Sequence, residues 1–157
     1  MHEPFDMNAR DSNSDASAGR SEATQPNRYR LLIVEDEAVI RFVLRCELER
    51  HGFEVTEFED GGTALECFNE DPEAWTGAFV DLLLPDTHGD LLIERFLALR
   101  PDLPVVLMTG DCDPDTERKA RERQLTILRK PFPLERLRPL VAEMLRQADA
   151  TQQGRST

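Results

Sequence analysis

The chain has 157 residues, of which 39% are hydrophobic, and its formal net charge is −12. This length fits one domain with a single core, and the acidic balance argues against general nucleic-acid binding. No apolar run approaches the ~18 residues of a membrane helix, and the three widely spaced cysteines favour neither a disulfide framework nor a zinc site. We therefore expect a reduced, cytoplasmic protein with no membrane partner.

The first 27 residues are polar and show no apolar periodicity, which predicts a disordered N-terminal extension. Short apolar strands then alternate with helices. The strands are expected at residues 31–34, 53–58, 77–80, 104–108 and 126–128, and the helices at residues 39–48, 63–69, 89–100, 115–124 and 134–145. This alternation predicts an open α/β domain with a parallel sheet over residues 28–147, followed by a disordered tail at residues 148–157.

Polar side chains follow four of these predicted strands. Glu35 and Asp36 follow the first, Asp81 the third, Thr109 the fourth and Lys130 the fifth. Because the carboxyl ends of parallel strands meet at one edge of a sheet, we expect these side chains to converge. Taken singly, each has an ordinary alternative; Asp36, for example, is also suited to capping the first helix.

The predicted cluster suits phosphoryl transfer. Crowded carboxylates repel one another, and Mg²⁺, which prefers oxygen ligands, would relieve that repulsion. A carboxylate can also act as the nucleophile that forms an aspartyl phosphate. A nearby ammonium would pair with phosphoryl oxygens, and a hydroxyl would donate one more hydrogen bond. The sequence therefore predicts a phosphoryl acceptor.

Four segments together resemble the receiver domain of two-component response regulators. They read LLIVEDE, FVDLLLPDTHG, VVLMTG and ILRKPF, with 45, 28 and 21 residues separating Asp36, Asp81, Thr109 and Lys130. The resemblance implies a flavodoxin-like, doubly wound (βα)5 fold with strand order 2-1-3-4-5. It also implies a cis bond between Lys130 and Pro131.

The resemblance assigns a role to each site residue. Asp81 would accept the phosphoryl group, with Thr109 and Lys130 contacting it. Asp36 would bind Mg²⁺ directly, Glu35 would bind it through water, and Asp81 and the Leu83 carbonyl would complete the protein ligands. The donor would be a sensor histidine kinase or a phosphotransfer protein, and we expect slow self-dephosphorylation rather than enzymatic turnover. His88 matches a variable position and is expected on the surface.

The chain departs from the family pattern at two places, and one of them, Ile127, leaves an alternative open. Ile127 replaces the usual aromatic residue, and Arg123-Gln124 replaces a common Gly-Ala pair. A constitutive binding module with vestigial phosphorylation is therefore the competing hypothesis. A third hypothesis, an aspartate-nucleophile phosphatase, needs a second Asp two residues after the nucleophile. This chain has Leu83 there, so the phosphatase hypothesis is set aside.

Residues 118–146 carry 9 basic and 3 acidic side chains, whereas residues 28–117 carry 7 basic and 22 acidic ones. This asymmetry indicates either a docking surface or ordinary solvated helix faces. The predicted basic face consists of Arg118, Lys119, Arg121, Arg123, Arg129, Arg136, Arg138 and Arg146. Only a short polar segment follows Leu145, so we expect output through an acidic protein partner rather than through nucleic acid.

Overall fold

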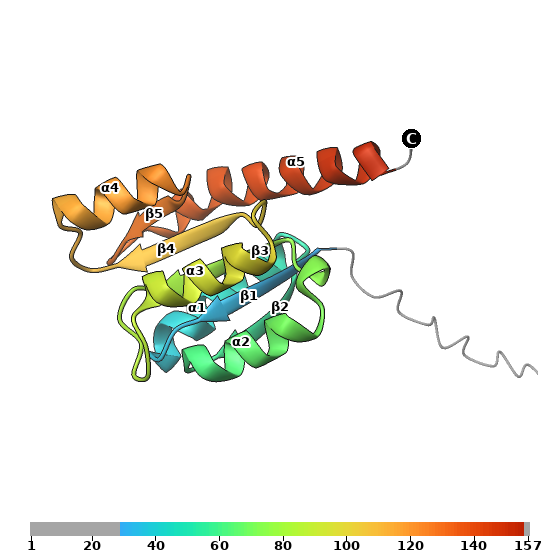
Figure 1. Cartoon of the computed structure of the whole chain (residues 1–157). Coiled ribbons are helices and arrows are strands. Elements are labelled where there is room, and N and C mark those ends of the chain that lie inside the picture. Colours follow the sequence, from blue (N-terminus) through green and yellow to red (C-terminus); the bar gives the residue numbers. More distant parts are fainter. Residues whose placement is uncertain (1–28, 156–157) are drawn as a thin grey trace, which may run out of the picture.

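The computed structural model describes residues 29–155 and consists of a five-stranded parallel sheet between two layers of helices (Figure 1). The strands lie in the order β2-β1-β3-β4-β5. Their bounds are Arg30–Val34 (β1), Glu54–Phe58 (β2), Gly77–Asp81 (β3), Val105–Thr109 (β4) and Thr126–Arg129 (β5). The helices are Ala38–Arg50 (α1), Gly61–Glu70 (α2), Gly89–Leu99 (α3), Pro114–Glu122 (α4) and Leu137–Arg155 (α5). The predicted fold and strand order are confirmed.

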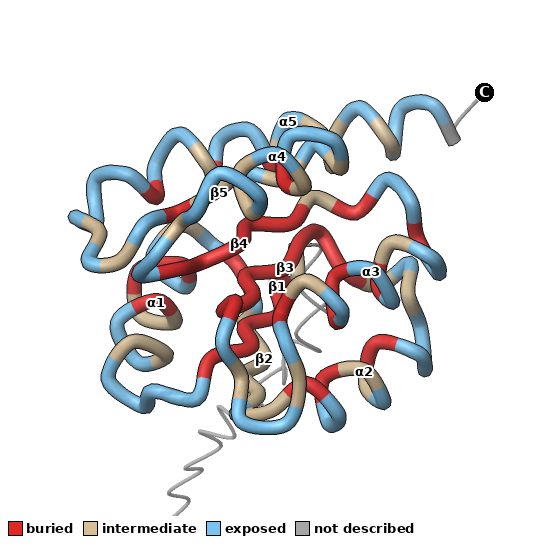
Figure 2. Tube along the Cα trace, turned by 60° about the vertical axis from the view of Figure 1, so that its left-hand side comes forward, coloured by how far each residue is buried: buried red, intermediate tan, exposed pale blue. Residues whose placement is uncertain are grey.

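The central strands are buried on both faces, as Figure 2 shows. Every residue of β3 and β4 is buried, because helices cover both sides of the sheet. On one face, α2 and α3 pack through the rings of Phe68 and Phe96, whose centroids lie 4.4 Å apart. On the other, Leu44 of α1 and Val141 of α5 pack against the sheet. These two cores hold the carboxyl ends of the strands in register.

Two helices end in the same backbone motif with different residues. After α1, Gly52 has φ +91° and its N–H donates to Glu49, while the next N–H donates to Leu48. After α4, Gln124 has φ 58° and makes the equivalent hydrogen bond to Arg121. Glycine adopts this left-handed conformation at little cost, whereas Gln does not. The chain therefore carries local backbone strain just before β5.

The last helix is longer than the sequence indicated. α5 continues to Arg155, so the predicted disordered tail at residues 148–157 is wrong for residues 148–155. The added turns are stabilised by packing and polar contacts, which a local apolar pattern does not reveal: Asp149 accepts a 2.7 Å hydrogen bond from the Tyr29 hydroxyl, and Thr151 donates to the Gln147 carbonyl. The predicted disordered extension at residues 1–27 lies outside the described residues.

Smaller differences concern the loops. Short 3-10 turns at Pro72–Ala74 and Leu134–Arg136 were not predicted. The N-cap of α1 is Glu37, without a side-chain capping hydrogen bond, so the alternative capping role of Asp36 is wrong. Among the described residues, no helix combines the length and apolar character needed to cross a membrane.

Candidate functional site

Three carboxylates meet at the carboxyl edge of the sheet, as predicted. Glu35 and Asp36 follow β1, and Asp81 ends β3 beside it. One oxygen from each of the three side chains lies within 4.8 Å of the others. Glu35 is fully buried and Asp81 is buried, whereas Asp36 is exposed to solvent. Asp36 therefore forms the solvent-facing side of the cluster.

Lys130 neutralises part of this cluster. Its Nζ lies 2.7 Å from Glu35 Oε2 and 3.1 Å from Asp81 Oδ2. Its backbone N–H donates to the Thr109 carbonyl at 2.8 Å, which ties the ends of β4 and β5 together. The bond to Pro131 is cis, as the resemblance implied. One ammonium thus faces three carboxylates, leaving a net negative site.

The charge imbalance appears in the pKa values of the site. Burial raises the pKa of Glu35 to about 7, and the neighbouring charge of Asp81 adds to this rise while the bond from Lys130 opposes it. Burial would lower the pKa of Lys130, but its bonds to Glu35 and Asp81 outweigh burial and raise it. The ammonium stays charged at neutral pH, and the site has room for further positive charge.

The Thr109 side chain is buried beside the cluster but is turned toward its own loop. Its hydroxyl donates a 2.6 Å hydrogen bond to the Asp111 carbonyl and accepts a 3.2 Å bond from the Asp111 N–H. Thr109 thus reaches the predicted edge. Its predicted hydrogen bond to a phosphoryl group stays a prediction.

The loop between β3 and α3 lies over Asp81. Leu83 is 67% exposed, and its N–H donates to Asp81 Oδ1 at 3.4 Å. His88, expected on the surface, is exposed and its Nδ1 lies 2.5 Å from Asp90 Oδ1. A Cβ on Gly89 would lie only 2.1 Å from the Asp81 carbonyl oxygen, so α3 begins in direct contact with Asp81.

Two supporting residues were not predicted. Arg41 of α1 donates to the carbonyl oxygens of Glu35 and Asp36 at 2.7 and 3.0 Å, and it pairs with Glu59. Asp86, in the loop after β3, bonds to the start of α2. Arg41 carries no distinguishing signal in the sequence, because its contacts depend on how the turn after β1 folds back.

An apolar cleft adjoins the carboxylate cluster. It is lined by Val39, Ile40 and Val43 of α1, by Lys130, and by Phe132 of the next loop, and its volume is about 470 Å³. Val39 is 75% exposed and Phe42, on the same helix, is 57% exposed. Apolar side chains of this size are normally buried, so this surface is suited to covering by another protein.

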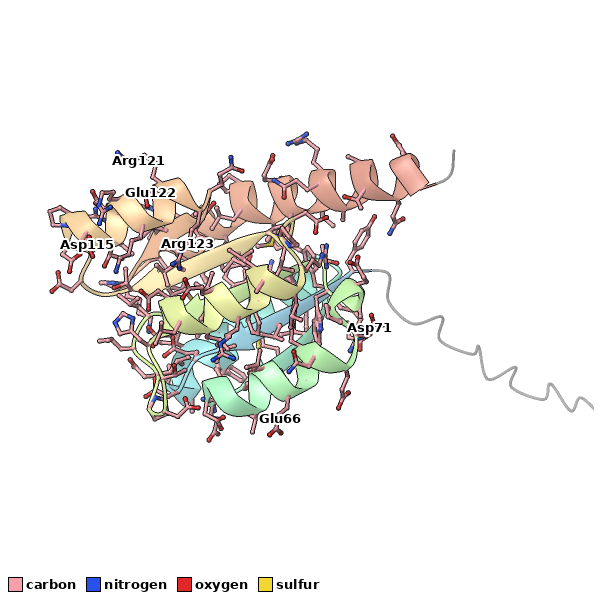
Figure 3. The ribbon with its side chains drawn as sticks, viewed as in Figure 1. Glu66, Asp71, Asp115, Arg121, Glu122 and Arg123 are labelled. Atoms are coloured by element: carbon pink, nitrogen blue, oxygen red, sulfur yellow. The ribbon has the colours of Figure 1, made fainter. Side chains whose placement is uncertain are left out.

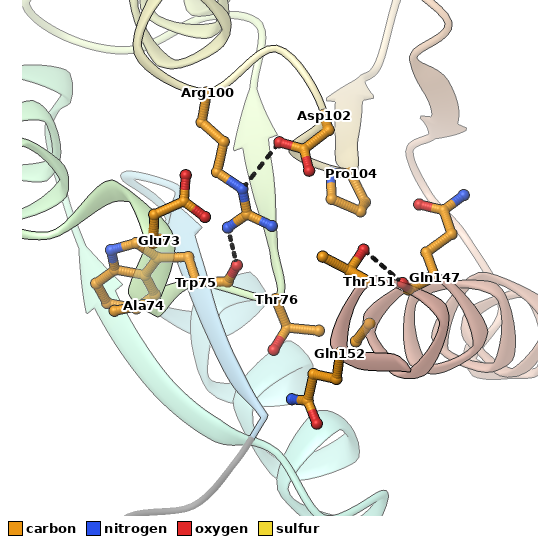
Figure 4. Close-up of a pocket in the computed structure, with 11 residues that line it drawn as sticks. Glu73, Ala74, Trp75, Thr76, Arg100, Asp102, Pro104, Gln147, Thr151 and Gln152 are labelled. Carbon is orange, nitrogen blue, oxygen red and sulfur yellow. Dashed lines mark hydrogen bonds and ion pairs between the residues drawn. The ribbon is translucent and has the colours of Figure 1, made fainter. Parts of the chain in front are cut away.

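A second, smaller cavity lies at the opposite edge of the sheet, where the strands begin (Figure 4). There the Arg100 guanidinium donates to the carbonyl oxygens of Pro72 and Trp75 and pairs with Asp102 at 3.2 Å. The carboxylate cluster shares no residue with this cavity. Arg100 is satisfied mostly by the protein itself, which indicates a structural role.

The predicted basic face is largely neutralised by its own neighbours. Five of its members have acidic partners: Arg118 and Lys119 pair with Asp115, Arg123 with Glu94, Arg129 with Glu117, and Arg146 with Glu143. Figure 3 shows acidic and basic side chains side by side on α4. Within residues 29–155, only Arg121, Arg136 and Arg138 of this set lack an ion-pair partner.

Comparisons with known proteins agree with this geometry. The family model described as "Response regulator receiver domain" matches residues 31–142. The chain is 33% identical over 119 residues to the response regulator receiver protein CpdR of Brucella abortus (strain 2308), covering 73% of this chain and 92% of that protein. It is 35% identical over 88 residues to the transcriptional regulatory protein CssR of Bacillus subtilis (strain 168), covering 55% of this chain and 38% of the relative.

A solved structure shares the fold. The CheY-like receiver domain protein of Methanospirillum hungatei JF-1 superposes with a TM-score of 0.71 at 27% identity, covering 78% of this chain and 98% of that one. The family match spans both core faces and all four strand ends that form the site. On this evidence the chain belongs to the response regulator receiver domains of two-component systems.

Proposed function

We propose that Asp81 accepts a phosphoryl group from a phosphohistidine of a sensor kinase or phosphotransfer protein, and that the chain then signals through protein contacts. The observation that carries this proposal is the cluster of three carboxylates around one ammonium at the carboxyl edge of the sheet. Lys130 contacts both Asp81 and Glu35, but burial raises the pKa of Glu35 to about 7, and Asp81 holds the acceptor position that the family resemblance assigns. Intact Thr109 and Lys130 support the same role.

The residues present fit a bound Mg²⁺. Three carboxylates against one ammonium leave unbalanced negative charge, and Mg²⁺ prefers oxygen ligands. Asp36 and Asp81 would bind the ion directly, Glu35 through water, and Leu83 through its carbonyl oxygen. When bound, the ion would neutralise charge on the entering phosphoryl oxygens. The acidic cluster would thus attract the cation, and the bound cation would offset the repulsion between the carboxylates and an anionic phosphodonor.

The protein residues have distinct tasks in the proposed transfer. An Asp81 carboxylate oxygen forms the new P–O bond while the P–N bond of the donor breaks and the electron pair returns to the donor imidazole. Lys130, already 3.1 Å from Asp81, balances charge on the phosphoryl oxygens. Thr109 would donate to one of these oxygens, which requires its hydroxyl to leave the Asp111 carbonyl.

The apolar cleft beside the site is the proposed surface for the phosphodonor. The donor must bring its histidine to Asp81, and the cleft formed by α1 and Phe132 borders Lys130 directly. The exposed side chains of Val39 and Phe42 extend this surface along α1. Burying them against the donor would provide affinity without any contact to the reacting group.

The proposed output surface is the face formed by α4, β5 and α5. Because most of its cations are already paired, the free charge of this surface comes from Arg121, Arg136 and Arg138. An acidic protein partner remains the proposed occupant, with association that weakens as salt rises. Arg121 and Arg136 are the informative pair for charge reversal, because Arg118 is engaged with Asp115 and Glu122.

One departure keeps a constitutive binding module as the second candidate. Ile127 lies on β5, half-buried, where an aromatic ring would be able to swing inward. A smaller side chain weakens the coupling between Thr109 and the output face.

The cytoplasm remains the proposed compartment, in keeping with the unpaired thiols of Cys46, Cys67 and Cys112.

The test is incorporation of labelled phosphate from a small phosphodonor or from a phosphohistidine protein, with and without Mg²⁺. Wild type should be labelled only with Mg²⁺, and Asp81→Asn should abolish labelling while keeping the fold. Asp102→Asn, an exposed carboxylate at the opposite edge, is the matched control and should label normally. Labelling of Asp81→Asn at the wild-type level would remove Asp81 from the role.

A further inference from the structure

The carboxylate of Asp86 joins the loop after the phosphoacceptor to a helix that is distant in sequence. Asp86 Oδ1 accepts a hydrogen bond from the Gly61 N–H, and Oδ2 accepts one from the Gly62 N–H, both at 2.9 Å. These N–H groups open α2, where the helix leaves its first donors unsatisfied. The loop after β3 is therefore joined to α2 by two hydrogen bonds.

Asp86 is not the capping residue of α2. That role belongs to Asp60, whose side chain accepts a 2.8 Å hydrogen bond from the Thr63 N–H. The hydrogen bond from Gly61 lowers the pKa of Asp86, with Gly62 adding to the effect, so the carboxylate is ionised at neutral pH and faces the positive end of the helix. The two carboxylates divide the first donors of the helix, with Asp60 accepting from Thr63 and Asp86 from Gly61 and Gly62, and only the Asp86 contact joins the helix to the loop.

The loop also packs tightly against the start of α2, where Thr87 lies over Gly61. A Cβ built on Gly61 would lie 2.5 Å from the Thr87 Cγ2 atom, closer than real carbon atoms approach. Its next neighbours would be at ordinary distances: Asp86 Oδ1 at 3.5 Å and Leu92 Cδ2 at 3.6 Å. The loop thus sits against α2 at a distance that only glycine allows, and a single methyl group of Thr87 sets that limit.

The loop that carries Asp86, between β3 and α3, is connected to Asp81 by backbone hydrogen bonds. Leu83 and His88 form an antiparallel bridge across the loop, and the Gly89 N–H donates to the Leu82 carbonyl at 2.6 Å. The Leu83 N–H in turn donates to Asp81 Oδ1. A displacement of Asp86 would therefore move the Leu83 backbone, and with it the carbonyl assigned to the metal.

We propose that Asp86 is a positioning residue for the phosphoacceptor site, holding the Leu83 backbone where it completes the Mg²⁺ ligands beside Asp81. This inference rests on the proposed function, because it concerns the same site. It places a determinant of metal affinity in a residue outside the carboxylate cluster, whose two oxygens accept hydrogen bonds from Gly61 and Gly62.

The first experiment compares two carboxylates at the same helix end. Asp86→Ala should weaken Mg²⁺ binding about tenfold, the lower range for loss of a group that orients metal ligands, and should slow phosphorylation at limiting Mg²⁺ more than at saturating Mg²⁺. Asp60→Ala removes the helix cap without touching the loop. It should lower the denaturation midpoint at least as much as Asp86→Ala does, yet leave Mg²⁺ affinity unchanged. Mg²⁺ affinity is measured by calorimetry.

The second experiment moves the loop without changing any charge. Gly61→Ala introduces the methyl group that meets Thr87, and it should weaken Mg²⁺ binding although alanine favours the helix. Adding Thr87→Ser removes the Cγ2 atom while keeping the hydroxyl, and should restore the affinity. Rescue of this kind would not follow from general destabilisation of α2, because Thr87→Ser adds nothing to the helix.

The outcomes separate this inference from the proposed function. If wild type neither binds Mg²⁺ nor takes up phosphate, the proposed function fails, and the inference that rests on it fails too. If wild type does both and Asp86→Ala matches it in Mg²⁺ affinity, the positioning role is overturned while the proposed function stands. Equal loss of Mg²⁺ affinity in Asp60→Ala would also overturn it, since the effect would then come from α2 alone.

Discussion

The Lys130 ammonium lies 2.7 Å from the Glu35 carboxylate, so a fully buried acid is matched to a cation that it shares with Asp81. The shared ammonium compensates only partly for the cost of burying the Glu35 charge, because burial still raises the pKa of Glu35 to about 7. In the metal-free protein, Glu35 is therefore near half-ionisation at neutral pH. This relationship makes the stability of the metal-free protein depend on pH.

The direction of that dependence follows from proton binding. Between pH 4.5 and about 7, the folded protein keeps a proton on Glu35 that the unfolded chain has lost, so stability falls as pH rises through this window. Glu35→Gln should remove the effect and stabilise the protein at pH 8 by on the order of 2 kcal/mol, with little change near pH 4. Denaturant unfolding with a chelator present measures this.

A neighbouring exposed acid supplies the control for this measurement. Glu59→Gln removes a carboxylate that pairs with Arg41 at the surface, and it should leave the pH profile of stability unaltered. A Glu35→Gln protein whose stability falls with pH as steeply as wild type would show that Glu35 does not titrate in this window.

Asp36→Ala should have opposite effects on metal binding and on metal-free stability. It removes a proposed direct ligand, so Mg²⁺ affinity should fall by about tenfold or more. It also removes one of three mutually repelling carboxylates, so the metal-free protein should gain up to roughly 1 kcal/mol. Calorimetric titration and denaturant unfolding measure the two effects. Retention of full Mg²⁺ affinity would place the ion elsewhere.

Gln124→Gly should stabilise the protein by about 1 kcal/mol, because glycine adopts the left-handed conformation at this helix end without the cost that Gln meets. Gly52→Ala is the mirror experiment after α1. A Cβ there meets no atom within 4 Å, so its expected loss of about 1 kcal/mol would come from the backbone alone. Urea midpoints at constant slope measure both. A destabilised Gln124→Gly protein would contradict the assignment of strain.

Asp111→Ala should lengthen the lifetime of the phosphoryl group. Asp111 is exposed beside Thr109 and carries a carboxylate able to orient an attacking water, whereas the apolar side chain of Leu83, two residues after Asp81, cannot orient one. Loss of label from purified phosphoprotein, followed over time, measures the rate. Cys112→Ser, the next residue in the loop, should decay like wild type. Decay of Asp111→Ala at the wild-type rate would assign hydrolysis to water that Asp111 does not orient.

Most of the fold could be predicted from the sequence because the three central strands are buried on both faces and read as continuous apolar runs. The site could be predicted as well, because Asp81, Thr109 and Lys130 each stand where an apolar run ends. The strand-end rule needs no knowledge of side-chain contacts. It fails for Asp86, whose partners Gly61 and Gly62 lie in a helix more than 20 positions earlier.

The charge pattern was harder to interpret. Counting cations over residues 118–146 excluded Asp115 and Glu117, which lie just outside that window and pair with Arg118, Lys119 and Arg129. Two of these pairs have helical i,i+3 and i,i+4 spacing and were accessible from sequence. The pair between Glu117 and Arg129 joins α4 to β5 and needed the fold. Net charge over a segment is therefore a poor measure of a surface.

The hydrogen bond between Tyr29 and Asp149 has a practical consequence for handling the protein. It holds the start of β1 beside the far turns of α5, at the edge of the sheet opposite the carboxylate cluster (Figure 1). A fluorophore or affinity tag joined at either end of the described chain would thus leave from the same side and keep clear of Asp81. A donor–acceptor dye pair placed at these ends would monitor docking of α5 without obstructing phosphotransfer.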